Sequence, residues 1–385
     1  MRNAHLQTRA VHAGRDDLVA LGVHATPLDL STTYPSRDSR REAQRLDVWA
    51  TGEVAEGQPI YGRLANPTVT RFETALAELE GCESAVAFAS GMAALSACLL
   101  ACAAAGQRHV VALRPLYGTS DFLLESGLLG TQVTWADPDS VTAAIRDDTG
   151  MVIAETPANP TLEQVDIAAL ARACGDTPLL IDNTFATPIL QRPADHGAAL
   201  VLHSATKFLG GHGDVMGGIV ACDEAWARRL RQIRFATGAM LHPLAGYLLL
   251  RGLSTLAVRM RESSATAWIL ANQLADHPRV TRMHYPCGNE QGHNPQMRSG
   301  GALITIEIDG DPHAVINAVQ VFTPAVSLGS VDSLIQHPGS LSHHIIEPET
   351  REQIGISENS LRLSIGLEHH DDLWSDLDQA LRSTT

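Results

Sequence analysis

Short apolar strand patterns alternate with helical patterns through the middle of the chain. The predicted strands cover residues 85–89, 110–113, 132–135, 151–155, 178–182, 198–202 and 217–221, and predicted helices cover 69–80, 91–105, 139–146 and 167–174. Alternation of this kind is typical of an α/β fold in which a mostly parallel sheet is wrapped by helices. Ligands of such folds bind beyond the carboxyl ends of the strands, so polar residues at these ends are the candidates for a functional site.

Lys207 comes shortly after one of these strands. The stretch from Leu200 to Asp214 delivers Ser204, Thr206 and Lys207 into a glycine-rich turn. A free lysine has a pKa near ~10.4 and is a poor nucleophile at neutral pH, so a chemical role requires burial or a partner that removes its charge. Schiff-base formation with an aldehyde cofactor meets this requirement. A surface lysine at a strand end is the alternative interpretation.

Other strand ends also carry polar or aromatic residues. The stretch Ser90-Gly91-Met92 opens a helix whose free amides and dipole suit a phosphate, although ordinary helix capping gives the same pattern. Tyr117 follows a strand and either stacks on a planar ligand or packs against the protein. Asp182 ends a strand, where a protonated heteroaromatic nitrogen would satisfy a buried carboxylate, with an Asx turn or helix cap as the alternative. Glu155 and Asn159 stand at the end of another strand.

The chain divides into three predicted parts: an arm at 1–60, a large domain at 61–250 and a small α+β domain at 251–385. The arm shows little periodicity and cannot bury a face of its own, so it must pack on the main body or on another subunit.

The small domain follows a long helical pattern at 246–275, in which Gly252 is a candidate break. The strand patterns there cover 302–308 and 360–365, a helix is predicted from Pro312 to Phe322, and another helix ends the chain. Arg362 lies in an apolar strand, where a guanidinium requires a carboxylate from a ligand or from the protein itself.

Composition limits the partners and the compartment. The 385 residues include 28 Lys+Arg against 43 Asp+Glu, and the formal net charge of -15 disfavours binding to nucleic acid or to an anionic membrane. The six cysteines, at positions 82, 98, 102, 174, 222 and 287, show no CxxC pair and no metal-ligand spacing, so reduced and mostly buried thiols are expected, with no metal. Neither a secretory signal nor a membrane span is recognisable, and a cytoplasmic protein is expected.

Four motifs, in order, resemble the pyridoxal-phosphate-dependent enzymes of cysteine and methionine metabolism, the family of cystathionine γ-lyase, cystathionine γ-synthase and methionine γ-lyase. They are Tyr-Gly-Arg-Leu-Ala-Asn-Pro-Thr at 61–68, Ala-Ser-Gly-Met-Ala-Ala at 89–94, Asp-Asn-Thr-Phe-Ala-Thr-Pro at 182–188 and His-Ser-Ala-Thr-Lys-Phe-Leu-Gly-Gly-His at 203–212. The resemblance covers nearly the full length. It implies an aspartate-aminotransferase-type fold, pyridoxal 5'-phosphate as cofactor, and a homotetramer built from two catalytic dimers.

The resemblance also implies roles for individual residues. Lys207 holds the cofactor, Asp182 pairs with its pyridinium nitrogen, Tyr117 stacks on its ring, and Asn159 contacts its phenolic oxygen. The phosphate is held by Ser90, Gly91, Met92, Ser204 and Thr206, joined by Tyr61 and Arg63 from the neighbouring subunit. The substrate carboxylate is bound by Arg362, with Ser327 nearby. The implied reaction is γ-elimination, in which Lys207 moves the α-proton, Tyr117 protonates the departing thiol, and a 2-oxo acid and ammonia are formed.

Three activities compete within the family: release of methanethiol from methionine, cleavage of cystathionine, and γ-replacement on an activated homoserine. The run from Ser333 to His343 is most similar to the methionine lyases, and methionine γ-elimination is the main hypothesis. Thr119 and the pair Arg234-Phe235 depart from the methionine-lyase pattern and are expected to set substrate choice, while Asp332 leaves recognition of a cystathionine amine open. A non-catalytic binding protein on the same fold is the remote alternative.

Overall fold

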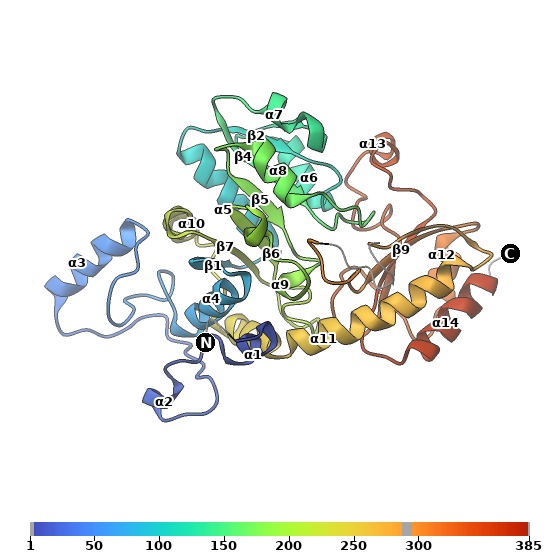
Figure 1. The fold of residues 1–385 in the computed structure, drawn as a ribbon. Coiled ribbons are helices and arrows are strands. Elements are labelled where there is room, and N and C mark those ends of the chain that lie inside the picture. Colours follow the sequence, from blue (N-terminus) through green and yellow to red (C-terminus); the bar gives the residue numbers. More distant parts are fainter. Residues whose placement is uncertain (1–3, 287–294, 384–385) are drawn as a thin grey trace.

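Two β-sheets, each with helices packed against it, make up the molecule. The structure is a computed structural model and describes residues 4–286 and 295–383. Figure 1 shows the larger sheet at the centre and the smaller sheet towards the C-terminus, and the long helix α11 (Pro243–Ala275) runs from one to the other.

The larger sheet has seven strands in the order β1-β7-β6-β5-β4-β2-β3. They are β1 (Ser84–Phe88), β2 (His109–Ala112), β3 (Gln132–Trp135), β4 (Thr149–Glu155), β5 (Leu179–Asp182), β6 (Leu200–Ser204) and β7 (Gly218–Cys222). β3, β2, β4, β5 and β6 are parallel to one another, whereas β7 is antiparallel to both β1 and β6. The predicted mostly parallel α/β fold is therefore confirmed, and the carboxyl ends of β2, β4, β5 and β6 meet at one edge.

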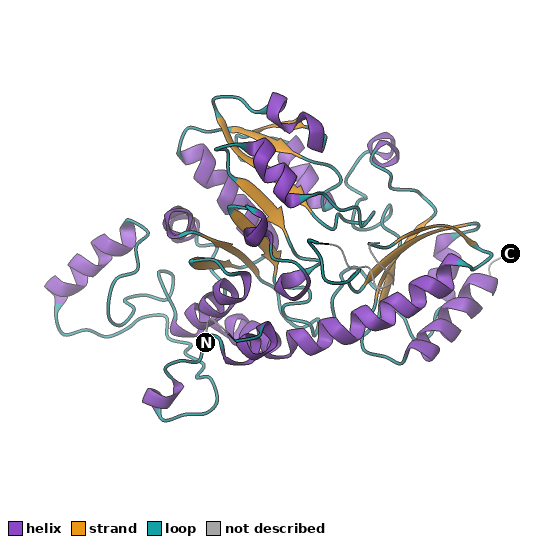
Figure 2. Cartoon of the chain, viewed as in Figure 1, coloured by secondary structure: helices purple, strands orange, loops and turns teal. Residues whose placement is uncertain are grey.

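Helices cover both faces of this sheet (Figure 2). They are α4 (Pro67–Glu80), α5 (Gly91–Ala104), α6 (Gly118–Glu125), α7 (Val141–Ala144), α8 (Ile167–Cys174), α9 (Thr187–Leu190) and α10 (Glu224–Thr237), with 3-10 helices η1 (Pro138–Ser140) and η2 (Pro193–His196). Successive side chains of a strand point to opposite faces, and β6 shows the consequence: Leu200 and Leu202 pack in the core with α5 and α10, and Val201 packs in the core with α4 and α11.

Helix α11 continues through Gly252, so the expected break there is wrong. Gly252 is buried, and a Cβ atom at this position would collide with the carbonyl oxygens of Leu209 and Gly210. Arg259 follows Gly252 by about two helical turns. Its side chain joins α11 to the segment after Lys207 by donating to the carbonyls of Gly252 and Phe208. The glycine thus permits close approach of α11 to the segment after Lys207, and the helix tolerates it because of that packing.

The smaller sheet has five strands in the order β10-β11-β12-β9-β8. Its elements are β8 (Val280–His284), β9 (Leu303–Ile308), β10 (Thr323–Pro324), β11 (Leu334–Gln336), β12 (Ser360–Ser364), α12 (Pro312–Ala318), α13 (Pro348–Gln353) and α14 (His370–Ser383). α12 ends earlier than the predicted Phe322 because the buried carboxylate of Asp376 accepts the amides of residues 320–322, which removes them from the helix. The predicted boundary between residues 250 and 251 falls inside α11 and remains a prediction about domain division.

Much of the segment from residue 13 to residue 60 extends away from the sheets. α1 (Leu6–His12) packs on α4 and α11, whereas α2 (Leu18–Leu21) and α3 (Ser39–Ala50) project from the body (Figure 1). Apolar side chains on this projecting part are open to solvent, with Val19 92% and Leu30 59% exposed. Apolar side chains exposed together on a projecting segment are typical of an interaction surface.

Cys98, Cys102, Cys174 and Cys222 are buried free thiols, and Cys82 is a partly buried one. Cys287 lies outside the described residues. Across residues 4–286 and 295–383, none of the helices is both long and apolar enough to span a bilayer.

Candidate active site

A cavity of about 220 Å³ lies at the carboxyl edge of the larger sheet, where β12 of the smaller sheet approaches it. It brings together nearly all the residues predicted from the sequence: Ser90, Gly91, Met92, Tyr117, Asn159, Asp182, Ser204, Thr206, Lys207, Ser327 and Arg362. Residues that end or follow five strands of the larger sheet therefore face one volume with a loop residue, Ser327, and a strand residue, Arg362, of the smaller domain. Such a meeting is expected where parallel strands end together.

Lys207 is the reactive amine of this cavity. Its Nζ donates to Ser327 Oγ at 2.8 Å, and burial, followed by the positive charge of Arg362, lowers the pKa of Lys207 to about 8. A larger share of the amine is therefore neutral near pH 7 than for a solvated lysine, and a neutral amine is the form that adds to an aldehyde. It is also the single lysine of the 385-residue sequence, so no other side-chain ε-amine competes with it.

Two carboxyl groups, Asp182 and Glu155, lie next to each other at the ends of paired strands β5 and β4. Burial raises the pKa of both, and in Glu155 the negative charge of Asp182 raises it further. Glu155 accepts two backbone amides, from Tyr117 and Asn159. Asp182 receives both the hydroxyl and the amide of Thr184 on Oδ1 alone, which leaves Oδ2 for a cation in the cavity.

The N-terminus of α5 faces the cavity from the other side. Ser90 caps the helix by accepting the amide of Ala93 on its Oγ, and the first-turn residues Gly91 and Met92 line the cavity. A Cβ on Gly91 would lie 3.0 Å from the Cβ of Ser204, so glycine lets the helix terminus approach the end of β6. Helix amides, a helix dipole and the hydroxyls of Ser204 and Thr206 form a receptor for an anion such as phosphate.

Arg362 lies deep in the cavity wall. Its Nη1 donates to Asn159 Oδ1 at 2.8 Å and its Nη2 to the carbonyl of Ser327 at 2.9 Å. The buried Nε has no hydrogen-bond partner among the described residues, and burial lowers the pKa of Arg362 to about 10. Ser327 itself has a φ of 127°, an uncommon conformation for a non-glycine residue that is typically found at binding sites. Arg362 lines the cavity, and its guanidinium charge fits a carboxylate ligand.

Tyr61 and Arg63 are the two predicted site residues that do not line this cavity. Arg63 donates from Nη1 to the carbonyl of Phe235 at 2.9 Å, and its guanidinium lies 4.8 Å from the centre of the Phe235 ring and 5.6 Å from that of Tyr61. Tyr61 is 45% exposed. The two side chains thus form a separate surface cluster with Phe235, away from the cavity of their own chain.

The role of the residues expected to set substrate choice stays a prediction. Thr119, Arg234, Phe235 and Asp332 do not line the cavity of this chain. Arg234 is buried, forms an ion pair with Glu73 and donates to the carbonyl of Ala87, so its role within the chain is structural. The sequence analysis missed several residues that do line the cavity: Ser120, Thr184, Phe185, Leu202, Met216, Val326, Leu328 and Ser342. Two of them could have been found by their position in the sequence, because Thr184 lies two residues after Asp182 and Val326 directly precedes Ser327.

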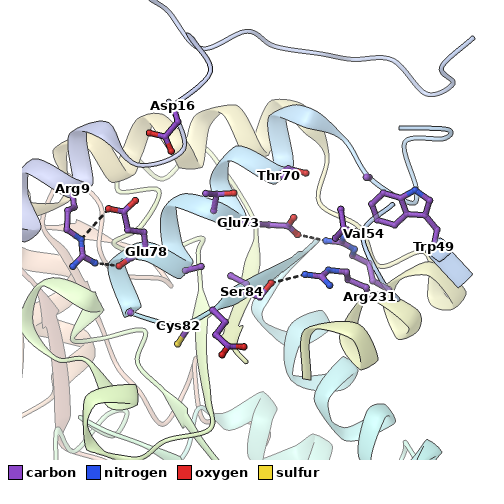
Figure 3. A pocket seen from close by; sticks show the side chains of 17 residues that line it. Arg9, Asp16, Trp49, Val54, Thr70, Glu73, Glu78, Cys82, Ser84 and Arg231 are labelled. Atoms are coloured by element: carbon purple, nitrogen blue, oxygen red, sulfur yellow. Dashed lines mark hydrogen bonds and ion pairs between the residues drawn. The ribbon is translucent and has the colours of Figure 1, made fainter. Parts of the chain in front are cut away.

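A larger cavity, of about 740 Å³, lies along α4 and is shown in Figure 3. Most of its charged side chains are paired with other groups of the protein: Arg9 with Glu78, Arg231 with Ser84 and Glu224, and Arg234 with Glu73. It lies away from the carboxyl ends of the parallel strands, and its described lining includes neither Lys207 nor any other residue predicted to hold the cofactor. We therefore place the chemistry in the smaller cavity.

An amine that reacts with aldehydes, a buried carboxyl that lacks a cation and a receptor for an anion meet in one small volume. A phosphorylated pyridine aldehyde satisfies all three, and together with the sheet order this combination defines the class of pyridoxal-phosphate-dependent enzymes with an aspartate-aminotransferase-type fold. The chain belongs to the family of Cys/Met metabolism PLP-dependent enzymes, whose model matches residues 7–382.

Individual relatives agree with this family. An L-methionine gamma-lyase of Streptomyces avermitilis is 66% identical over 377 residues, which cover 98% of this chain and 89% of the relative. An L-methionine gamma-lyase of Brevibacterium sandarakinum is 53% identical and is covered over 98% of its length by 99% of this chain. Among solved structures, cystathionine gamma-lyase from Lactobacillus plantarum, complexed with L-serine, matches with a TM-score of 0.88 at 33% identity and 99% coverage of both chains.

Proposed function

We propose that this enzyme is a methionine γ-lyase, which converts methionine and water into methanethiol, 2-oxobutanoate and ammonia. The observation that carries the proposal is an apolar wall, formed by Met216, Val326 and Leu328, in a cavity whose charged groups are committed either to protein partners or to the cofactor and the α-carboxylate. Glu155 holds two backbone amides, Asp182 is bonded to Thr184, Lys207 to Ser327, and Arg362 to Asn159 and Ser327.

An uncharged methylthioethyl side chain suits this wall. The second amino-acid end of cystathionine carries an ammonium and a carboxylate, and burial of either without a partner is costly. Within one chain, the lining of the cavity offers no additional charged residue to receive them. The 66% identical relative named L-methionine gamma-lyase supports the same choice. Cystathionine cleavage and γ-replacement on an O-acylhomoserine are the alternatives that the assay below separates.

The residues of the chain then have defined tasks. Arg362, which lines the cavity, binds the α-carboxylate, and the neighbouring Ser327 accepts a hydrogen bond from Nζ of Lys207. Lys207 accepts the α-proton at Nζ, and Tyr117 Oη donates a proton to the departing sulfur. The bound cofactor supplies the electron sink that makes loss of the α-proton possible.

Further residues would hold the cofactor. Asp182 offers Oδ2 to the pyridinium nitrogen, and the amides of Gly91 and Met92 with the hydroxyls of Ser204 and Thr206 hold the phosphate. Because Arg362 occupies Oδ1 of Asn159, the Nδ2 group of Asn159 remains to donate to the phenolic oxygen.

The test is a comparison of substrates with the purified, cofactor-loaded enzyme. We expect methionine to give equal amounts of methanethiol and 2-oxobutanoate, at a kcat/KM at least about 10-fold above that for cystathionine, homocysteine and O-acetylhomoserine. A preference for cystathionine, or formation of cystathionine from O-acetylhomoserine and cysteine, would replace the proposal by one of the alternatives.

The pKa of Lys207 predicts how the apoprotein reacts with pyridoxal phosphate. A value of about 8 leaves roughly 1% of the amine neutral at pH 6 and about half at pH 8. The neutral, reactive amine is therefore lost as the pH falls below about 8 and is nearly complete above about pH 9. The rate constant of cofactor uptake, followed by absorbance, should rise with pH and level off above about 9, whereas a solvated lysine would continue to gain reactivity up to about pH 10.4.

The Arg362→Leu variant serves as the comparison for this pH profile. Since the charge of Arg362 contributes to the low pKa of Lys207, its removal should move the midpoint to higher pH. An unchanged midpoint in Arg362→Leu would show that burial alone sets the reactivity of the amine. A wild-type midpoint near 10 would contradict the assignment of a buried reactive lysine.

Val326 is expected to govern the choice between methionine and larger polar substrates. Its side chain lines the cavity and is 61% exposed, so a longer residue fits without displacing the core. Val326→Glu places a carboxylate beside the methylthio group and offers a partner to a distal ammonium. We expect the ratio of kcat/KM for methionine to that for cystathionine to fall by about 10- to 100-fold, equivalent to ~1–3 kcal/mol.

Val321→Glu is the matched control, because Val321 is also an exposed valine, 39% accessible, but lies outside the cavity. It should leave the ratio unchanged. If the two variants behave alike, the apolar wall does not select the substrate.

We also propose a cytoplasmic homotetramer built from two catalytic dimers. The support is the projecting arm with its exposed apolar side chains and the cluster of Tyr61, Arg63 and Phe235, which lies apart from the cavity of its own chain. In a dimer this cluster would complete the phosphate site of the partner. Mass measurement in solution tests the assembly.

A further inference from the structure

His343 is a buried histidine with no role in the reaction described above. Its side chain lies in the segment after β11 and is fully shielded from solvent. Nε2 lies 3.2 Å from the carbonyl oxygen of Leu116, and Nδ1 lies 3.0 Å from Oγ of Ser342. The same Oγ lies 3.0 Å from Nε2 of Gln336. A continuous hydrogen-bonded chain therefore runs from the end of β11 to the residue before Tyr117.

The direction of every bond in this chain is fixed by chemistry. A carbonyl oxygen only accepts, so Nε2 of His343 carries the hydrogen. Burial, followed by the positive charge of Arg362, lowers the pKa of His343 to about 4, so the ring is neutral and Nδ1 is an acceptor. The hydroxyl of Ser342 must then donate to Nδ1 and accept from the amide of Gln336.

The peptide between Leu116 and Tyr117 is held at both of its polar groups. His343 binds the carbonyl, and the N–H of Tyr117 donates to Oε2 of Glu155 at 2.8 Å. The next residue, Gly118, is packed tightly against the segment that contains His343, since a Cβ there would collide with the carbonyl oxygen of Ser342. Rotation of this peptide plane, which would swing the Tyr117 ring, requires the loss of two buried hydrogen bonds.

Both polar groups of this peptide are connected to Arg362 or to its neighbour in the smaller sheet. From the N–H, Glu155 accepts the amide of Asn159, whose Oδ1 accepts Nη1 of Arg362. From the carbonyl, the chain through His343 and Ser342 ends at Gln336, which is the register partner of Arg362 between β11 and β12. The aromatic residue on the larger sheet and the guanidinium on the smaller sheet are thus connected by two independent routes.

We propose that His343 is a positioning residue which, through Ser342 and Gln336, fixes the Leu116–Tyr117 peptide relative to Arg362, so that the Tyr117 ring and the bound substrate carboxylate keep one mutual geometry. The inference rests on the proposed function only in assigning Tyr117 to the cofactor ring and Arg362 to the carboxylate.

The segment contains its own matched control. His337 is also buried, its Nδ1 lies 2.9 Å from Oγ of Ser340, and its Nε2 lies 2.9 Å from a backbone carbonyl. That carbonyl belongs to Glu358 and not to the Tyr117 loop. His337→Phe therefore removes the same kind of hydrogen-bonded histidine from the same segment without touching the peptide before Tyr117.

The experiment compares His343→Phe, His343→Gln and His337→Phe as purified, cofactor-loaded proteins. Three quantities are measured: kcat and KM for methionine, the visible circular dichroism of the bound cofactor, and the dissociation constant of pyridoxal phosphate from the apoprotein.

His343→Phe should lower kcat about 10- to 100-fold with a much smaller change in KM, and should weaken the dichroism, because a misplaced ring costs rate more than binding. His343→Gln, whose amide still donates to a carbonyl, should recover part of both. His337→Phe should change kcat and the dichroism by less than about 2-fold, even if it lowers Tm as much as His343→Phe does.

A double-mutant cycle with Tyr117→Phe separates positioning from a general structural effect. If His343 acts through Tyr117, the losses in kcat of the two single variants should not multiply in the double variant. Multiplicative losses, an unchanged dichroism in His343→Phe, or an equal effect of His337→Phe would each overturn the proposal. If His343→Phe does not fold, Ser342→Ala decides the matter, with a loss of kcat of about 3- to 10-fold expected and no loss refuting it.

The outcome is distinguishable from failure of the proposed function. Wild-type kcat and dichroism in Tyr117→Phe alone would remove Tyr117 from the mechanism. A strong effect of Tyr117→Phe with no coupling to His343 would remove only the positioning role. The dichroism and the cofactor affinity do not depend on which sulfur amino acid is the substrate.

Discussion

Replacement of Lys207 by alanine is expected to reduce turnover of methionine by at least about 10³-fold. The side chain is the single lysine of the sequence, its amine has a pKa lowered to about 8, and Ser327 holds it beside Arg362. No other ε-amine is available to replace it in covalent attachment of the cofactor or in transfer of the α-proton. The measurement is kcat for methionine with the variant saturated in pyridoxal phosphate.

Two further experiments test the role of Lys207 directly. Borohydride reduction of the wild-type enzyme should fix the cofactor to one peptide, that containing Lys207, and should fix none to an internal residue of Lys207→Ala. Lys207→Arg retains the positive charge but cannot add to an aldehyde, because a guanidinium remains protonated, so it should be as inactive as the alanine variant. Activity near that of the wild type in either variant would remove Lys207 from the reaction.

Mixing two inactive variants should restore activity if each active site takes residues from two chains. Tyr61 and Arg63 lie outside the cavity of their own chain, in a cluster with Phe235, and the arm before them exposes apolar side chains. We expect Arg63→Ala and Lys207→Ala each to be inactive, and an equal mixture, after subunit exchange, to recover about a quarter of wild-type activity, since half of the dimers are hybrids with one intact site.

The control mixture combines Lys207→Ala with Asp182→Ala. Both residues line the cavity of a single chain, so every site in a hybrid dimer carries one lesion and no recovery is expected. Recovery in the first mixture alone supports a shared site. Absence of recovery in both, with subunit exchange demonstrated by mass, would show that each site is completed by one chain.

The sequence by itself determined the chemical identity of the site. Strand patterns that end in Asp182 and shortly before Lys207, and the Ser90-Gly91-Met92 helix start, are local features, and a parallel sheet necessarily carries such strand ends to a common edge. The lysine count is equally a sequence property, since a chain with one lysine has one possible side chain for covalent binding of an aldehyde. β3 and α8 occur at their predicted bounds because their apolar patterns are satisfied by neighbouring elements of the same sheet.

Only the tertiary structure decided what surrounds these groups. Gly252 signals a break by its propensity, yet α11 continues because the glycine allows contact with the segment after Lys207. The sequence does not reveal that Arg234 is buried in an ion pair with Glu73, a residue far away in sequence. Val326 has no distinctive local pattern, and the run that ends at His343 does not reveal what the His343 side chain contacts. Their places beside the cavity and behind Tyr117 depend on how the smaller sheet docks against the larger one, and contacts between residues some two hundred positions apart leave no periodic trace in a single sequence.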